Sequence, residues 1–199
     1  MQKEKKEFKT IITPPVKCEW AKILKPDYKF NPKGLFTIDL VFDITDKEHK
    51  EFLNKLEELL EDAYQKAVQE AKPQLKKKIQ KQDFYSIVYD ENGKETVFVK
   101  VRPKRVATRD SGELNLVKIF DAKGKEITKQ INIGNGSVVR AKILVSDYVM
   151  PTGTCGVSLK LNAVQIIDLV EYREDAGNFP AYSGGGYEFA EEEEGEADF

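Results

Sequence analysis

The sequence has few of the residues that form metal sites and activated nucleophiles. Its 199 residues include two cysteines and a single histidine, His49. Cys18 and Cys155 lie far apart, each among residues typical of strands, so neither a zinc-ligand spacing nor a Cys/His nucleophile pair is present. We expect two buried free thiols, as in a reducing cytoplasm, and a solvated His49 on the polar side of a helix. No metal and no cofactor is expected.

Long hydrophobic segments are missing as well. No apolar run approaches the length of about 18 residues that suggests a membrane span. The N-terminal stretch MQKEKKEFK is charged, and no apolar segment follows it as in a signal peptide. We therefore expect a soluble intracellular protein with no membrane contact.

Motifs of catalysis are also missing. An enzyme needs an activated nucleophile, a matched acid/base pair or a metal. The GNGS segment at residues 134–137 lacks the lysine and the following helix of a phosphate-binding loop, and AKGK at residues 122–125 is typical of a hairpin turn. Because one third of the chain is charged, its many pairs of acidic residues do not indicate a catalytic acid/base pair. The sequence predicts a protein that is not an enzyme.

Negative charge is concentrated at the C-terminus. Residues 188–199 (EFAEEEEGEADF) contain seven acidic residues, no basic residue and a terminal phenylalanine. All 32 lysines and arginines, but only 25 of the 34 acidic residues, lie in residues 1–173, which therefore carry a net charge of +7. We expect a basic domain over residues 1–173, a flexible linker over 174–187 and a disordered acidic tail over 188–199.

Strand-like segments alternate with turn signals along the basic domain. They are rich in β-branched and aromatic residues and cover residues 16–24, 35–44, 84–89, 96–102, 114–120, 137–146 and 156–172. Two prolines and a glycine between the first two segments predict a loop over residues 25–34.

One long helix is expected after the second strand. Thr45 and Glu48 have the spacing of a capping box, and apolar residues recur every three or four positions from Phe52 to Ala71. Pro73 should end this helix, and a short helical turn or a flexible loop should follow. The sequence thus predicts a mainly β protein, an OB-fold-like Greek-key barrel with one long inserted α-helix and a disordered acidic C-terminal tail. A parallel α/β fold is disfavoured because one long helix cannot supply its crossovers.

Positive charge is interleaved with aromatic residues in three clusters, at residues 20–33, 102–109 and 140–148. Aromatic rings can stack on unpaired bases while basic groups follow the phosphates. The candidate DNA-binding residues are Trp20, Lys22, Tyr28, Phe30, Lys33, Arg102, Lys104, Arg105, Arg109, Arg140, Lys142 and Tyr148. For Trp20, a place in the hydrophobic core stays open as the alternative.

The basic domain and the acidic tail together favour a sequence-nonspecific single-stranded DNA-binding protein. The tail can lie in a basic groove when DNA is absent and be displaced when DNA binds. An acidic-tailed protein-interaction adaptor or a nucleic-acid-mimicking inhibitor is the alternative. A nuclease on a similar barrel is disfavoured because no catalytic residues are recognisable.

Five segments resemble the single-stranded DNA-binding protein of T-seven-like phages. They are AKILKPDY with NPKGLFTIDLVF at residues 21–42, EDAYQKAVQEA at 61–71, FDAKGK at 120–125, IGNGSVVRAKILVSDY at 133–148 and GVSLKLNAVQIIDL at 156–169. The tail that ends in Asp198 and Phe199 is similar as well. The likeness spans most of the chain.

The resemblance implies an OB-fold that coats single-stranded DNA, promotes strand annealing and acts in phage DNA replication and recombination in the cytoplasm of the infected bacterial host. It also implies a homodimer and tail contacts with the phage DNA polymerase and helicase-primase. By position, Lys33, Lys142 and Tyr148 match residues expected at the DNA face. The tail residues expected to bind partners are Glu191, Glu192, Glu193, Glu194, Glu196, Asp198 and Phe199.

Overall fold

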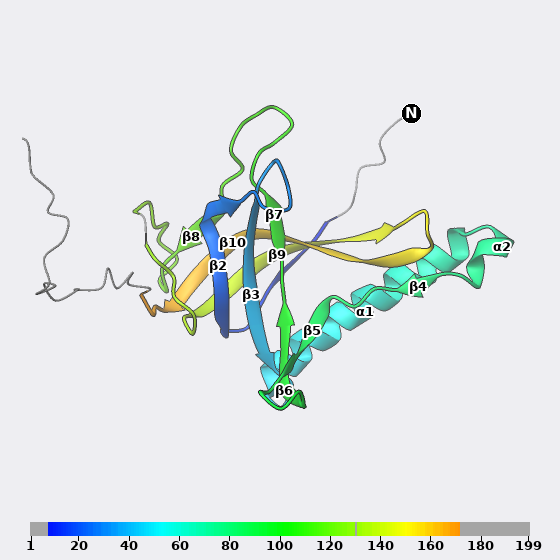
Figure 1. Ribbon diagram of the computed structural model, residues 1–199, viewed down its shortest axis with the longest axis horizontal. Coiled ribbons are helices and arrows are strands. Elements are labelled where there is room, and N and C mark those ends of the chain that lie inside the picture. The colour runs from blue at the N-terminus through cyan, green and yellow to red at the C-terminus, as the bar shows by residue number, and fades with distance from the viewer. Residues whose placement is uncertain (1–7, 130, 172–199) are drawn as a thin grey trace, which may run out of the picture.

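Two helices interrupt a series of strands in the computed structural model, which describes residues 8–129 and 131–171 (Figure 1). The strands are β1 (Lys9–Ile12), β2 (Val16–Asp27), β3 (Leu35–Asp43), β4 (Gln80–Lys81), β5 (Tyr85–Tyr89), β6 (Glu95–Val101), β7 (Lys104–Val106), β8 (Lys118–Phe120), β9 (Val138–Val149) and β10 (Thr154–Asp168). The helices α1 (Lys47–Glu70) and α2 (Pro73–Lys76) lie between β3 and β4. The predicted mainly β composition with one long inserted helix is confirmed.

Five of these strands close into a barrel. β2 pairs with β3 and β9, β3 pairs with β7, and β10 pairs with β7 and β9. Every pairing in this ring is antiparallel except that of β7 with β10. A small barrel of five strands is the arrangement of the OB-fold, so the predicted fold class is confirmed. Outside the ring, β1 extends the sheet beside β9, and the β5–β6 pair extends it from β3.

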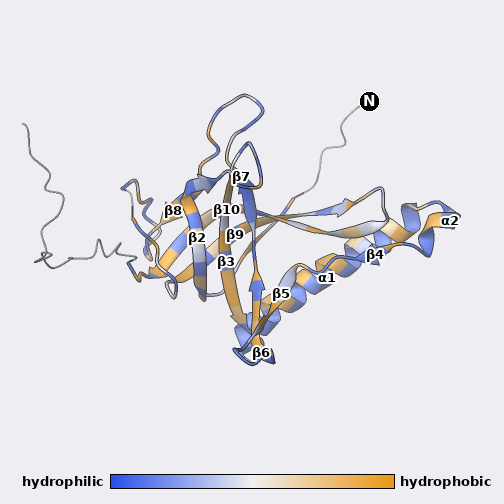
Figure 2. Cartoon of the chain, viewed as in Figure 1, coloured by the Kyte–Doolittle hydropathy of each residue, from blue (hydrophilic) through white to orange (hydrophobic). Residues whose placement is uncertain are grey.

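The core of the barrel follows the alternation of a half-buried strand. In β3, Phe36, Ile38, Leu40 and Phe42 are all fully buried. They meet the alternate residues of β9 that point inward, Val139, Ala141, Ile143 and Val145. Burial of one large apolar side chain contributes about 1.5 to 3 kcal/mol, so these two strands supply much of the stability. The residues that alternate with these along each strand point to the outer face of the barrel. Figure 2 shows hydrophobic and hydrophilic residues interleaved along the strands of the barrel.

Helix α1 packs one apolar face against β3, β9 and β10. The buried residues recur every three or four positions and are Phe52, Leu56, Leu60, Ala63 and Ala67. β9 and β10 run past the barrel along α1 as a long ribbon (Figure 1). Pro73 follows shortly after the helix ends, as predicted. It begins the short helix α2, so of the two alternatives for this segment, a helical turn or a loop, the structure has the helical turn.

The predicted capping box of Thr45 and Glu48 at the start of α1 is wrong. The cap is Asp46, whose carboxylate accepts a hydrogen bond from the backbone N–H of His49 at 3.0 Å. Thr45 instead donates its backbone N–H and its hydroxyl to Asp43, at 2.8 and 2.6 Å. These hydrogen bonds from Thr45 lower the pKa of Asp43. Both Thr45 and Asp46 fit the N-cap position, and the bond to Asp43 decides between them.

His49 has a structural role, which corrects the expectation of a solvated side chain. Its Nδ1 accepts the backbone N–H of Asp43 at 3.0 Å, so Nε2 carries the hydrogen and donates to the carbonyl of Pro15 at 3.1 Å. The imidazole also packs edge-on against Phe42, with ring centroids 5.6 Å apart. His49 therefore fastens the start of α1 to β3 and to the β1–β2 connection.

Two strand boundaries and three short strands also depart from the sequence expectations. β2 continues through Pro26 to Asp27, so the loop begins at Tyr28. Proline is tolerated here because the pairing of β2 with β3 is irregular between Lys22 and Asp27. The predicted strand at residues 114–120 shortens to β8, and the short strands β1, β4 and β7 were not predicted.

Cys18 and Cys155 are buried free thiols, as predicted. Burial raises the pKa of Cys18 to about 11. A thiol with such a pKa stays protonated at neutral pH and is a poor nucleophile.

Candidate nucleic-acid interface

A groove runs across the outer face of the barrel and has two parts. The first part, about 490 Å³, is lined by Trp20, Lys22, Asp27, Phe30, Leu35, Thr37, Asp39, Arg102 and Lys104. The second part, about 860 Å³, is lined by Leu35, Gln82, Asp83, Phe84, Arg102, Lys104, Val106, Asn115, Tyr148, Met150, Val157, Ser158, Leu159 and Lys160. Because both parts share Leu35, Arg102 and Lys104, they form one continuous surface, called the barrel groove below.

Three lysines cross the barrel groove in register. Lys22 of β2 lies opposite Thr37 of β3, Thr37 lies opposite Lys104 of β7, and Lys104 lies opposite Lys160 of β10. Adjacent strands are about 4.8 Å apart, so the set spans roughly 14 Å of sheet. Lys22, Lys104 and Lys160, called the lysine row, form a line of positive charge of the kind that follows a phosphate backbone.

The three lysines differ in their neighbours. Lys22 donates to Asp27 at 2.5 Å, and this hydrogen bond lowers the pKa of Asp27. The Lys160 ammonium lies 5.7 Å from the ring centroid of Phe8. Lys104 has no ion-pair partner within residues 8–129 and 131–171. An incoming anion therefore meets an unpaired Lys104 at the centre of the row.

Lys160 is a residue that sequence reasoning missed. It lies between Leu159 and Leu161 in β10, and the full burial of Leu161 turns Lys160 to the outer face. The alternation Leu-Lys-Leu could have indicated an outward lysine. It could not indicate that Lys104 would be its neighbour.

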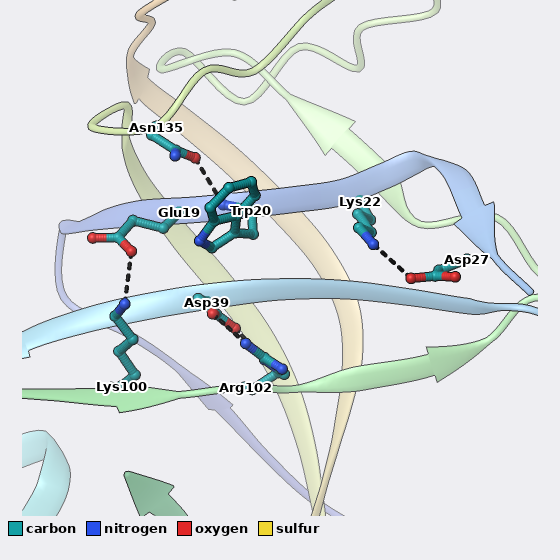
Figure 3. Close-up of polar contacts among 8 residues, drawn as sticks. All are labelled: Glu19, Trp20, Lys22, Asp27, Asp39, Lys100, Arg102 and Asn135. Atoms are coloured by element: carbon teal, nitrogen blue, oxygen red, sulfur yellow. Dashed lines mark hydrogen bonds and ion pairs between the residues drawn. The ribbon is translucent and has the colours of Figure 1, made fainter. Parts of the chain in front are cut away.

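Arg102 lies between the two parts of the barrel groove and is fixed by a buried carboxylate (Figure 3). Its Nε and Nη2 donate to the two oxygens of Asp39, whose side chain is only 3% exposed. These hydrogen bonds raise the pKa of Arg102 above its ordinary value. A guanidinium has five N–H donors, so three remain for a ligand, and the Arg102 side chain is 58% exposed. A planar donor held in this way suits a phosphate or a base edge.

Trp20 is presented to the barrel groove by a bulge in β2. Between the pairs Glu19 with Asp39 and Lys22 with Thr37, β2 has two residues where β3 has one. Trp20 takes a left-handed conformation with φ of +50°. Among the described residues, every other residue with a positive φ is a glycine. Trp20 is 63% exposed, which excludes the alternative of a core position. An exposed indole beside lysines can stack on a base.

The left-handed conformation of Trp20 predicts an unusual stability order for its variants. Trp20→Gly should be more stable than Trp20→Ala by about 1 kcal/mol, because an L-residue with a side chain is strained at this φ and glycine is not. Urea unfolding of both variants measures the difference. At Lys22, which occupies a paired strand position, the same two substitutions should give the opposite order. Equal or reversed stabilities at Trp20 would show that the bulge relaxes when the indole is removed.

Two more aromatic side chains from the sequence prediction line the barrel groove. Phe30 lies in the β2–β3 loop and is 83% exposed. Tyr148 of β9 lies opposite Gly156 of β10, and a Cβ at Gly156 would come within 2.7 Å of the tyrosine hydroxyl oxygen. Glycine at this position therefore leaves room for the Tyr148 ring to lie across β10. Together, the sequence-predicted residues that border the barrel groove are Trp20, Lys22, Phe30, Arg102, Lys104 and Tyr148.

Three predicted residues lie in loops outside the lining of the barrel groove. The Tyr28 ring packs close to Gly34, at whose left-handed backbone a Cβ would come within 2.9 Å of the ring. Lys33 in the same loop pairs with Asp110 at 2.5 Å. Arg109 pairs with Glu113 at 3.4 Å.

Arg105 is occupied within the protein. Its guanidinium donates to Asn115, to the carbonyl of Leu161 and to Asn162. Burial, together with the charge of Arg109, lowers the pKa of Arg105. The structure thus gives Arg105 a role in fastening β7 to β10, and it does not line the barrel groove.

Arg140 and Lys142 lie on another part of β9. They border a smaller hollow of about 220 Å³ together with Ile12, Phe120, Gly124, Ala163, Val164 and Gln165. Arg140 donates to the carbonyl of Thr13 at 3.3 Å and to Gln165 at 3.4 Å. The structure therefore does not bring this pair together with Arg102 and Lys104.

The seven tail residues expected to contact partners, Glu191 to Phe199, lie outside the described residues. In the part of the chain that is described, no three His, Cys, Asp or Glu side chains are close enough together to hold a metal ion. No helix in residues 8–129 and 131–171 is both long and apolar enough to cross a membrane.

Comparison with known proteins places these features in a family. The sequence profile of the family described as single-stranded DNA-binding protein, bacteriophage T7, matches residues 16–169. No curated protein sequence matches this chain significantly.

Solved structures with similar folds come from two phages. The crystal structure of gp2.5, a single-stranded DNA-binding protein encoded by bacteriophage T7, has a TM-score of 0.68 and 23% identity, over 87% of this chain and 98% of that one. A C-terminal truncation of the single-stranded DNA-binding protein from bacteriophage Enc34 has a TM-score of 0.56 and 13% identity, over 81% and 87%. The Enc34 protein in complex with single-stranded DNA has a TM-score of 0.52 and 13% identity, over 84% and 89%.

These structural likenesses show the OB-like fold, and the profile match covers most of the chain, including the strands that carry the lysine row. The family is defined by DNA binding and not by a catalysed reaction. The chain therefore belongs to the bacteriophage T7 family of single-stranded DNA-binding proteins.

Proposed function

We propose that this protein binds single-stranded DNA along the barrel groove without sequence preference. The lysine row and Arg102 contact the phosphates, and Trp20, Phe30 and Tyr148 stack on bases. The observation that supports this most directly is the register of Lys22, Lys104 and Lys160 beside exposed aromatic side chains. Backbone charges and aromatic faces do not distinguish one base from another, so the binding is nonspecific.

The salt dependence of binding tests the role of the lysine row. Lys104→Gln removes an unpaired charge at its centre, so the slope of log K against log salt should become shallower by about 0.7 for a single strand. Affinity should fall to a similar extent for oligo-dT and for a mixed-sequence oligonucleotide. Fluorescence titration of Trp20 at several salt concentrations measures both quantities.

Lys55→Gln is the matched control, because Lys55 is an exposed lysine on α1 and lies outside the barrel groove. It should leave the slope unchanged. If Lys104→Gln and Lys55→Gln gave the same slope as the unaltered protein, the lysine row would not be the phosphate contact. If this protein bound an acidic protein but had little affinity for oligo-dT, the adaptor function would be favoured instead.

We further propose that the protein acts in phage DNA replication and recombination, anneals complementary strands and forms a homodimer in the cytoplasm of the infected host. The acidic tail, residues 188–199, competes with DNA for the barrel groove and recruits the phage DNA polymerase and helicase-primase. These finer proposals are supported by the sequence resemblance and by the charge contrast between residues 1–173 and the tail.

A further inference from the structure

Asn135 lies in a tight turn that is bonded to the bulge of β2. Its Oδ1 accepts the backbone N–H of Trp20 at 2.8 Å, although 115 positions separate the two residues (Figure 3). The same turn is joined to β2 beside the bulge, because Cys18 donates its N–H to the carbonyl of Ser137 at 2.8 Å. The turn and the bulge therefore form one hydrogen-bonded unit.

This turn is itself held in place by Val170, which follows the end of β10. The buried Ser137 hydroxyl donates to the carbonyl of Gly134 at 2.8 Å and accepts the N–H of Val170 at 3.0 Å. Gly136 takes a left-handed conformation with φ of +91°, which glycine adopts without strain. The Asn135 amide is therefore presented from a fixed position.

Trp20 needs such support because its left-handed conformation is disfavoured for a residue with a side chain. A disfavoured conformation persists only where the surrounding structure holds it. Trp20 donates its backbone N–H to Asn135, which lies outside β2 and β3. This hydrogen bond acts at the residue whose φ is unusual.

We propose that Asn135 is a positioning residue for nucleic-acid binding. By accepting the N–H of Trp20, it keeps the bulge in the conformation that directs the indole to the barrel groove, where the indole stacks on a base. The stacking step rests on the proposed function, whereas the positioning of the indole can be measured without DNA.

The free protein provides the first test. Trp20 is the single tryptophan in the sequence, so tryptophan emission reports on this site alone. Asn135→Ala should shift the emission maximum and change the access of acrylamide to the indole. Asn135→Asp keeps the acceptor oxygen and should retain the original emission. Asn92→Ala, in the β5–β6 turn outside the barrel groove, is the control and should change neither property.

Binding to oligo-dT provides the second test. Asn135→Ala should lower affinity by about threefold to tenfold through lost stacking. Its salt slope should stay unchanged, because no charge is removed. In a Trp20→Ala background, the Asn135→Ala substitution should cause no further loss. If Asn135→Ala does not fold, Asn135→Ser, with a shorter side chain, is expected to give the same results.

The outcomes separate the two proposals. Unchanged emission, acrylamide access and affinity in Asn135→Ala would overturn the positioning role. An equal loss of affinity in the Trp20→Ala background would also overturn it, since Asn135 would then act independently of the indole. If the emission shifts but Trp20→Ala binds oligo-dT as well as the unaltered protein, the positioning role stands and the stacking role of Trp20 in the proposed function fails.

Discussion

Replacing Arg102 by alanine is expected to lower the free energy of unfolding by about 2 to 3 kcal/mol. The substitution leaves the carboxylate of Asp39, 3% exposed, without its cationic partner. Removal of one partner from a fully buried pair costs about 3 to 5 kcal/mol, and the exposure of Arg102 reduces this figure. Urea unfolding followed by circular dichroism measures the loss.

The matched control is Arg109→Ala. Arg109 also pairs with a carboxylate, but both its side chain and that of Glu113 are exposed, so the loss should stay below about 1 kcal/mol. The double variant Asp39→Leu with Arg102→Met removes both charges and should recover much of the stability lost in Arg102→Ala. It should not recover DNA affinity, because the guanidinium is missing. An Arg102→Ala protein as stable as the Arg109→Ala protein would contradict the importance of the buried carboxylate.

Deletion of residues 188–199 is expected to tighten binding to oligo-dT by about tenfold or more at low salt. Seven negative charges leave, and the remaining basic domain attracts phosphate without competition. The difference should shrink as the salt concentration rises, because screening weakens tail and DNA attraction alike. Titrations of the full-length and the truncated protein over a range of salt concentrations measure the effect.

Two further variants separate the charge of the tail from its terminal ring. Replacement of the tail glutamates by glutamine should tighten DNA binding in the same direction as the deletion. Phe199→Ala keeps every acidic side chain, so DNA affinity should stay unchanged while capture of the phage DNA polymerase and helicase-primase is lost. Weaker DNA binding by the truncated protein would contradict competition between the tail and DNA.

Helix α1 shows which parts of the fold can be predicted from local sequence. Apolar residues recur at helical spacing over many turns, and a proline lies just beyond the end of the helix. The presence and the length of the helix can therefore be predicted from residues near one another in the sequence. The sequence pattern predicts Thr45 as the N-cap, whereas the N-cap in the structure is Asp46. Both residue types suit the position, and the hydrogen bonds of Thr45 to Asp43 leave the cap to Asp46. Short strands such as β7 have too few residues to show a period, and long-range pairing defines them.

The candidate interface was predictable in composition and only partly in geometry. Trp20, Arg102 and Tyr148 were recognised by residue type, and all three border the barrel groove. Arg105 has the same chemistry as Arg102, but its guanidinium is bound within the protein. Lys160 was not predicted because the residues around a single lysine in a strand do not indicate which side chains lie beside it on the adjacent strand.

Local sequence specifies the chemical character of this protein. Alternation in the strands, one amphipathic helix and the separation of charge between residues 1–173 and 188–199 are local properties that neighbouring residues specify. Which charged side chains lie next to one another depends on the three-dimensional fold. Lys22 and Lys160 are aligned in one row only because of the register of four strands. Trp20 faces outward because of a bulge that is hydrogen-bonded to Asn135, 115 positions away. Register depends on long-range pairing, and a shift of one residue would exchange the inner and outer faces of a strand.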